Sequence, residues 1–176
     1  MLTDPLQSTL DVRKAAARGV SISGALKPLD LQRFRALLAG DAGQIRAHLA
    51  FSRDEEGRSV VHAVIEAEVE VTCQRCLQPM PLALGSDSIL GIVWNDDQAK
   101  HLPKHLDPLI VTEEGCDLWQ LVEEELMLAL PSYSYHEEED CNKDLAGFSG
   151  PAPEEGGDAE RSNPFEVLAQ LKPGKK

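Results

Sequence analysis

Residues 61–71 read VHAVIEAEVEV, and this stretch decides the fold. All six odd positions are apolar, whereas four of the five even positions carry histidine or glutamate. A period of two sustained over this length is typical of a β-strand with one face buried and the other in water. We therefore predict a long, half-buried strand here.

Further strands are predicted on both sides of this one. Residues 45–51 alternate in the same way, and the polar, glycine-containing stretch 52–58 separates the two strands as a hairpin loop. Residues 20–26 form a shorter candidate strand, and the apolar runs 82–84 and 89–94 continue the sheet. Consecutive strands with short connections pair antiparallel. The sequence therefore predicts an α+β fold: an antiparallel β-sheet, open or barrel-like, with flanking helices.

Two helices are predicted beside the sheet. Residues 117–131, DLWQLVEEELMLALP, begin at Asp117, which can form a capping box with Gln120, and end at Pro131, which cannot continue a helix. A second helix is predicted over residues 30–39, where leucine and phenylalanine recur at helical spacing.

The three consecutive glutamates of the longer helix should point in different directions. The apolar stripe of this helix consists of Leu118, Val122, Leu126 and Ala129. At about 100° per residue, Glu123 and Glu124 are predicted to point away from the stripe. Glu125 falls within it, so we expect a partly buried carboxylate paired with an arginine or with backbone N–H groups. The alternative for Glu125 is a metal-binding or catalytic role.

The chain is predicted to divide into three parts. Residues 1–141 form the α+β domain, and residues 142–162, rich in Gly, Pro and acid, form a disordered, flexible acidic linker. Residues 163–176 begin with Asn-Pro, a typical helix start, and carry Phe165, Leu168 and Leu171 at helical spacing. We predict a short C-terminal helix that acts as a docking motif.

Four residues have the types and spacing of a zinc site. Cys73 and Cys76 form a CxxC pair after the long strand, and His136 and Cys141 follow the longer helix, five positions apart. Thiolates and imidazole suit zinc, and a site closed by four protein ligands is structural. We therefore predict Cys73, Cys76, His136 and Cys141 as metal ligands and zinc as a structural cofactor. The alternative is a pair of reduced cysteines with an unrelated histidine.

Two catalytic functions compete with a structural metal site. A thiol redox protein would use Cys73 and Cys76, but a thioredoxin-type dithiol opens a helix, and residues 77–81 (LQPMP) are a poor helix start. A metal-dependent hydrolase would combine zinc with residues 123–125, but it needs an open coordination position that three cysteines and a histidine do not leave. The sequence also contains no glycine-rich phosphate loop and no nucleophile elbow. We expect no enzyme activity.

The charge of the chain limits its contacts with nucleic acid. The sequence has 30 acidic and 17 basic residues, a net charge of -13. Phosphates repel such a protein, so any RNA contact must be local or indirect. The first forty residues lean the other way, with six bases against three acids: Arg13, Lys14, Arg18, Lys27, Arg33 and Arg35. These bases are either solvated helix faces or a phosphate contact.

The compartment is expected to be the cytoplasm. No apolar run approaches the roughly 18 to 20 residues that span a bilayer, and the first fourteen residues lack the apolar region of a signal peptide. We expect no membrane partner.

Three stretches together resemble the YceD family, the large ribosomal RNA subunit accumulation proteins of bacteria. They are VEVTCQRCLQPM (69–80), DLWQLVEEELMLALP (117–131) followed by His136 and Cys141, and NPFEVLAQLK (163–172). The resemblance implies a cytoplasmic, non-enzymatic ribosome-biogenesis factor needed for synthesis, processing or stability of large-subunit ribosomal RNA. It implies partners among pre-ribosomal large-subunit components, a ribosomal protein or ribosomal RNA, and no small-molecule substrate.

Overall fold

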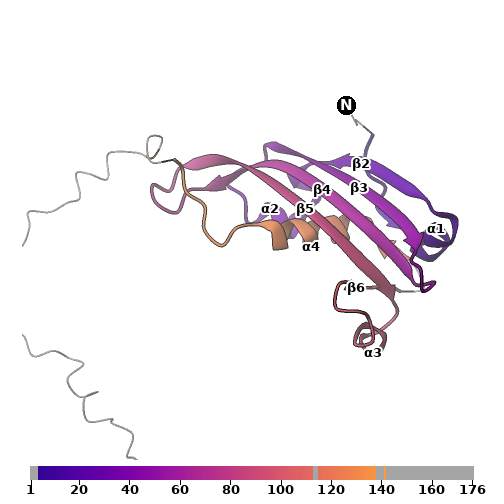
Figure 1. Ribbon diagram of the computed structural model, residues 1–176. Coiled ribbons are helices and arrows are strands. Elements are labelled where there is room, and N and C mark those ends of the chain that lie inside the picture. Colours follow the sequence, from indigo (N-terminus) through magenta and orange to yellow (C-terminus); the bar gives the residue numbers. More distant parts are fainter. Residues whose placement is uncertain (1–3, 113–114, 138–140, 142–176) are drawn as a thin grey trace, which may run out of the picture. The chain divides into compact units, whose positions relative to one another are not determined.

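A five-stranded sheet with helices on one face is the main feature of the computed structural model, which describes residues 4–112, 115–137 and 141 (Figure 1). The elements in chain order are β1 (Thr9–Leu10), α1 (Val12–Arg18), β2 (Ser21–Leu26), the 3-10 turn η1 (Pro28–Asp30), α2 (Gln32–Arg35), β3 (Gly43–Arg53), β4 (Ser59–Thr72), β5 (Pro79–Val93), α3 (Asp96–Ala99), β6 (Asp107–Ile110), β7 (Cys116–Asp117) and α4 (Leu118–Ala129). The class is α+β, as predicted.

The strand order of the large sheet is β2-β3-β4-β5-β6. Its first four strands pair antiparallel, as predicted, and the sheet is open, with β2 and β6 as its edges rather than the walls of a barrel. The two apolar runs predicted after residue 81 are parts of one long strand, β5. The unpredicted β6 pairs parallel to β5 because the chain crosses back through α3.

The stretch that opened the sequence analysis forms most of β4, the central strand. Val61, Ala63 and Ile65 are fully buried, whereas His62, Glu66 and Glu68 on the other face are exposed. Helices α1, α2 and α4 lie on the same side of the sheet, over the buried face (Figure 1). One hydrophobic core therefore fills the space between the sheet and these helices.

Both ends of α4 lie close to the positions that the sequence predicts. The Asp117 carboxylate accepts hydrogen bonds from the backbone N–H of Trp119 and Gln120, at 2.9 and 3.2 Å. The reciprocal bond of the predicted capping box is absent among these described residues, because the Gln120 side chain donates to Glu124 instead. The helix stops at Ala129, and Leu130 is extended, as expected for a residue before proline.

The prediction for Glu123 is wrong. This side chain is buried, and its Oε1 accepts hydrogen bonds from the backbone N–H groups of Arg33 and Phe34 at 2.6 and 3.2 Å. Its Oε2 accepts a further bond from Arg33 Nε at 2.8 Å. The N-cap residue of α2 is Leu31, which has no side-chain acceptor, so Glu123 caps α2 from another helix. A helix wheel of α4 alone cannot show that α2 packs there.

The other helix predictions hold in part. Glu125 is half-buried as predicted, but its partner is the Ser86 hydroxyl, which donates at 2.7 Å, rather than an arginine or the backbone. Glu124 is exposed, as predicted. The helix predicted over residues 30–39 is much shorter, since only Gln32–Arg35 is α-helical after the 3-10 turn.

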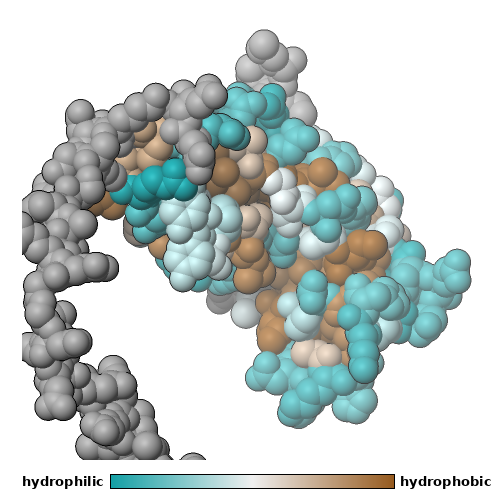
Figure 2. All heavy atoms as spheres, turned by 60° about the vertical axis from the view of Figure 1, so that its left-hand side comes forward, coloured by the Kyte–Doolittle hydropathy of each residue, from teal (hydrophilic) through white to brown (hydrophobic). Residues whose placement is uncertain are grey.

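The surface has no continuous apolar face in the direction shown in Figure 2. Hydrophobic patches there are separated by hydrophilic residues. Leu77, Leu128 and Tyr133 are the most exposed large apolar side chains among the described residues, at 71%, 81% and 71%.

No helix in the described part of the chain is long and apolar enough to cross a membrane. The predicted linker (142–162) and C-terminal helix (163–176) lie outside the described residues.

Candidate metal centre

The first half of the site is the tight turn that joins β4 to β5. Cys73 follows the last residue of β4 and is fully buried. Its N–H donates to Gln78 O at 2.9 Å, and its carbonyl accepts from Leu77 N at the same distance. Leu77 has φ of 60°, in the left-handed region of backbone conformation. Residues other than glycine adopt it only where the surrounding structure holds them in it. The turn is therefore shaped to bring Cys73 and Cys76 to the same side.

The second half of the site is the segment that follows α4. Pro131 ends the helix, and the chain then passes the turn, where Gln74 N donates to Ser134 O at 2.9 Å. This backbone bond ties together two segments that are sixty positions apart in the sequence. His136 and Cys141 follow in this segment and come beside the two cysteines of the turn.

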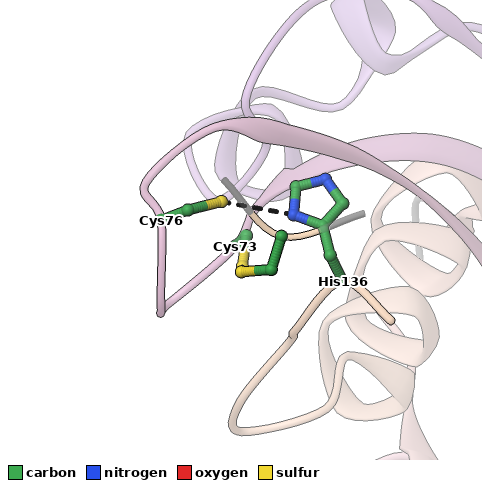
Figure 3. Close-up of side chains that lie close together, drawn as sticks. Cys73, Cys76 and His136 are labelled. Atoms are coloured by element: carbon green, nitrogen blue, oxygen red, sulfur yellow. Dashed lines mark hydrogen bonds between the residues drawn. The ribbon is translucent and has the colours of Figure 1, made fainter. Parts of the chain in front are cut away.

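The four predicted ligands meet in space. Their ligand atoms all lie within 4.8 Å of one another. Cys76 Sγ is 3.3 Å from His136 Nδ1, and Cys73 Sγ is 4.0 Å from Cys141 Sγ. Figure 3 marks the contact between Cys76 and His136 with a dashed line. A tetrahedral zinc ion places its thiolate and imidazole ligand atoms roughly 3.6 to 3.8 Å apart. The four side chains therefore fit a metal of this size, and they could bind one.

The hydrogen bond on the far side of the His136 ring sets its tautomer. Nε2 lies 3.2 Å from the carbonyl oxygen of Pro79, the first residue of β5. A carbonyl only accepts, so Nε2 donates this bond, and a neutral ring would then present the lone pair of Nδ1 to the cysteines. Metal-binding histidines are commonly oriented by such a second hydrogen bond.

The electrostatics of the site favour a cation. Burial raises the pKa of Cys73, but hydrogen bonds from the backbone N–H groups of Cys76, His136 and Arg75 outweigh it and lower the pKa to about 5. The hydrogen bond with Cys73 raises the pKa of His136, as does its contact with Cys76. Burial and the two neighbouring thiol groups raise the pKa of Cys141. A metal ion bound here would compensate the charge of the Cys73 thiolate and would favour the thiolate form of its neighbours.

The remaining candidate residues stand apart from this group. Cys116 is buried, and burial, followed by the charge of Asp117, raises its pKa to about 11, as suits a cysteine that packs in a core. None of the four cysteines is in a disulfide. Cys73 and Cys76 lie in a turn between two strands, whereas a thioredoxin-type pair opens a helix. The metal-ligand group found among the described residues includes no carboxylate.

Sequence reasoning missed two contributors to the site. The Pro79 carbonyl orients His136, and the backbone N–H of Arg75 stabilises the Cys73 thiolate. Neither has a sequence pattern, because every residue has a carbonyl group and nearly every residue has an N–H.

Comparison with known proteins identifies the family. The family model described as "Large ribosomal RNA subunit accumulation protein YceD" matches residues 61–172. A protein of Haemophilus influenzae with the same name is 33% identical over 169 residues, which cover 95% of this chain and 96% of that protein. The chain belongs to the YceD family. The YceD match contains all four residues of the candidate metal centre and extends into the C-terminal segment. No solved structure matches the chain.

Proposed function

We propose that this protein is a non-enzymatic ribosome-biogenesis factor that supports the accumulation of large-subunit ribosomal RNA through its synthesis, processing or stability. The observation that carries the proposal is similarity over nearly the full length of a relative named for that role. The protein works in the cytoplasm, on pre-ribosomal large-subunit particles, through contacts with ribosomal protein or local contacts with RNA.

The metal centre has a structural role in this proposal. Cys73, Cys76, His136 and Cys141 hold one zinc ion, and the fit of their ligand atoms to tetrahedral spacing supports this assignment. When bound, zinc supplies a cross-link between the β4–β5 turn and the segment after α4. Four protein ligands leave no position for a substrate or an activated water molecule, so the site does not support hydrolysis.

The proposed function is tested by recovering the protein from growing cells. The tagged full chain is purified at low and at moderate salt, and its bound RNA and proteins are identified. We expect precursors of large-subunit ribosomal RNA and large-subunit ribosomal proteins, in excess over small-subunit components. Depletion of the protein should lower large-subunit RNA relative to small-subunit RNA. Recovery of both subunits in equal amounts, with no change on depletion, would contradict the proposal.

A further inference from the structure

A cleft at the opposite end of β4 from the metal centre carries a positive charge that the chain as a whole lacks. Its volume is about 530 Å³. It lies between α1, the ends of β3 and β4, and the residues that follow β5 and β6. The residues that line it and enter the argument are Asp11, Arg13, Lys14, Arg53, Ser59 and Trp94.

Among the described residues that line the cleft, basic side chains outnumber acidic ones. Lys14 pairs with Asp11 at 2.9 Å, and Asp11 is the sole acid among the described lining residues. Arg13 and Arg53 form no ion pair with any carboxylate in the described part of the chain. Among the described residues, the cleft therefore presents two guanidinium groups that have no ion-pair partner, in a protein whose net charge is -13. A negatively charged ligand is attracted there and repelled by the protein's overall charge.

The cleft also presents an aromatic surface beside those charges. Trp94 follows β5 directly and is 37% exposed. The Arg13 guanidinium lies over the Trp94 ring, 4.7 Å from its centroid. An indole with a stacked guanidinium binds a flat nucleobase by stacking, and the arginine can also contact phosphate. The Ser59 hydroxyl supplies a neutral hydrogen-bonding group.

We propose that this cleft binds single-stranded RNA, with one unstacked base on Trp94 and the adjoining phosphates on Arg13, Lys14 and Arg53. This inference rests on the proposed function and deepens it, since it replaces an open choice between protein and RNA contacts with an RNA contact at a defined place. A single aromatic platform in a cleft of this volume fits an unpaired strand, whose bases are free to stack, and not a duplex. Local binding of this kind suits an acidic protein, which cannot hold RNA through its whole surface.

The test uses the purified full chain and a labelled single-stranded RNA of about ten nucleotides and mixed sequence, with binding followed by fluorescence anisotropy. Three basic contacts predict that log Kd rises with log salt concentration with a slope of roughly 2. Arg53→Glu should weaken binding at least about tenfold at about 0.1 M salt. Arg46→Glu is the matched control, because Arg46 lies on the same strand but faces Glu66 and Glu68 outside the cleft. It should bind within about twofold of the wild type.

Variants of Trp94 separate stacking from charge. Trp94→Ala should weaken binding at least about fivefold, whereas Trp94→Phe, which keeps a stacking surface, should stay within about threefold of the wild type. Arg53 and Trp94 lie on the surface, so these variants should fold, and circular dichroism spectra matching the wild type check this. A variant with an altered spectrum is replaced by Arg53→Gln or Trp94→Leu, for which the same losses are expected.

Four results would overturn the inference. They are no binding by the wild type, equal effects of Arg53→Glu and Arg46→Glu, full competition by an equal concentration of a mononucleotide, and competition by a polyglutamate peptide as effective as that by RNA. The last two would indicate a nucleotide pocket and an acidic protein partner, respectively. Failure of the proposed function is distinguishable, since it is measured by co-purification from cells and not by binding to the purified chain.

Discussion

At the scale of single residues, the candidate metal centre consists of four side chains that the fold brings together. Cys73 is fully buried, and its Sγ lies 4.0 Å from Cys141 Sγ, so its replacement would remove one of the four candidate ligands. We predict that the purified protein holds about one zinc per chain, and that Cys73→Ser lowers both zinc content and melting temperature. Elemental mass spectrometry and thermal unfolding measure the two quantities.

Cys116→Ser is the matched control for this prediction. Cys116 is equally a buried thiol, but it lies outside the ligand group. The control should keep its zinc even where the hydroxyl costs some stability. A metal-free wild-type protein, or a Cys73→Ser variant with full zinc content, would show that the four side chains do not bind zinc.

Glu123 carries the second prediction at this scale. Its carboxylate accepts bonds from two backbone N–H groups of α2 and from Arg33, and Glu123→Ala leaves those N–H groups without an acceptor. We expect a loss of about 2 to 3 kcal/mol in the free energy of unfolding, measured by chemical denaturation. Glu125→Ala should cost less, because the Ser86 hydroxyl that donates to its carboxylate can bond to water instead, and Glu124→Ala should cost least, because Glu124 is exposed. Equal losses for all three would refute this ranking.

The same carboxylate should make stability depend on pH. Burial raises the pKa of Glu123, but the bonds from Arg33 and Phe34 outweigh it and hold the pKa below the usual value of 4.5. A lowered folded-state pKa adds stability above the unfolded-state pKa, and that stability is lost as the pH falls through the folded value. The wild type should therefore lose more stability than Glu123→Gln when the pH is lowered below 4.5, as followed by denaturation at several pH values. Equal losses of stability in the wild type and in Glu123→Gln would contradict this prediction.

At the scale of elements, the sequence pattern predicted the long helix and strands but missed the short strands. The period of two in β4 and the cap and proline of α4 are local properties, so they could be read directly. β6 has four residues and β7 two, which is too short for any period to show, and both depend on partners distant in the sequence. The prediction for Glu123 was wrong because its burial also depends on a distant partner, the helix α2. Residue type and spacing singled out the four candidate ligands, and the structure brings them within 4.8 Å of one another; that they bind a metal stays a prediction.

The two halves of the candidate metal centre come from different parts of the chain, and a backbone hydrogen bond joins them. Gln74 N donates to Ser134 O, a bond between the β4–β5 turn and the segment after α4 that lies beside the ligand group. We expect chelation of zinc to speed hydrogen exchange of the Gln74 amide at least about tenfold. The amide of Ile65, at the centre of β4, should exchange unchanged and serves as the internal control. Uniform acceleration of both would mean that the metal holds the whole domain rather than this junction.

At the scale of the whole molecule, the question is what residues 163–176 do. The family match extends to residue 172, so this segment belongs to what the family has in common and is not an unrelated tail. We propose that it is a short docking helix, and that residues 142–162 are a flexible linker with a reach of roughly 25 Å. A helix of one or two turns with Phe165, Leu168 and Leu171 on one side is not stable alone in water, so it should order only against a partner.

Deleting residues 160–176 tests this proposal. The melting temperature should stay within about 2 °C of the full chain, because the deletion should leave the α+β core intact. Co-purification with large-subunit precursors, and the level of large-subunit RNA in cells, should both fall. Phe165→Ala in the full chain should reproduce the loss of co-purification, whereas Gln170→Ala, a polar position in the same segment, should not. A truncated protein that melts many degrees earlier would assign the segment to the core, since removing a docking element exposes no buried surface in the domain.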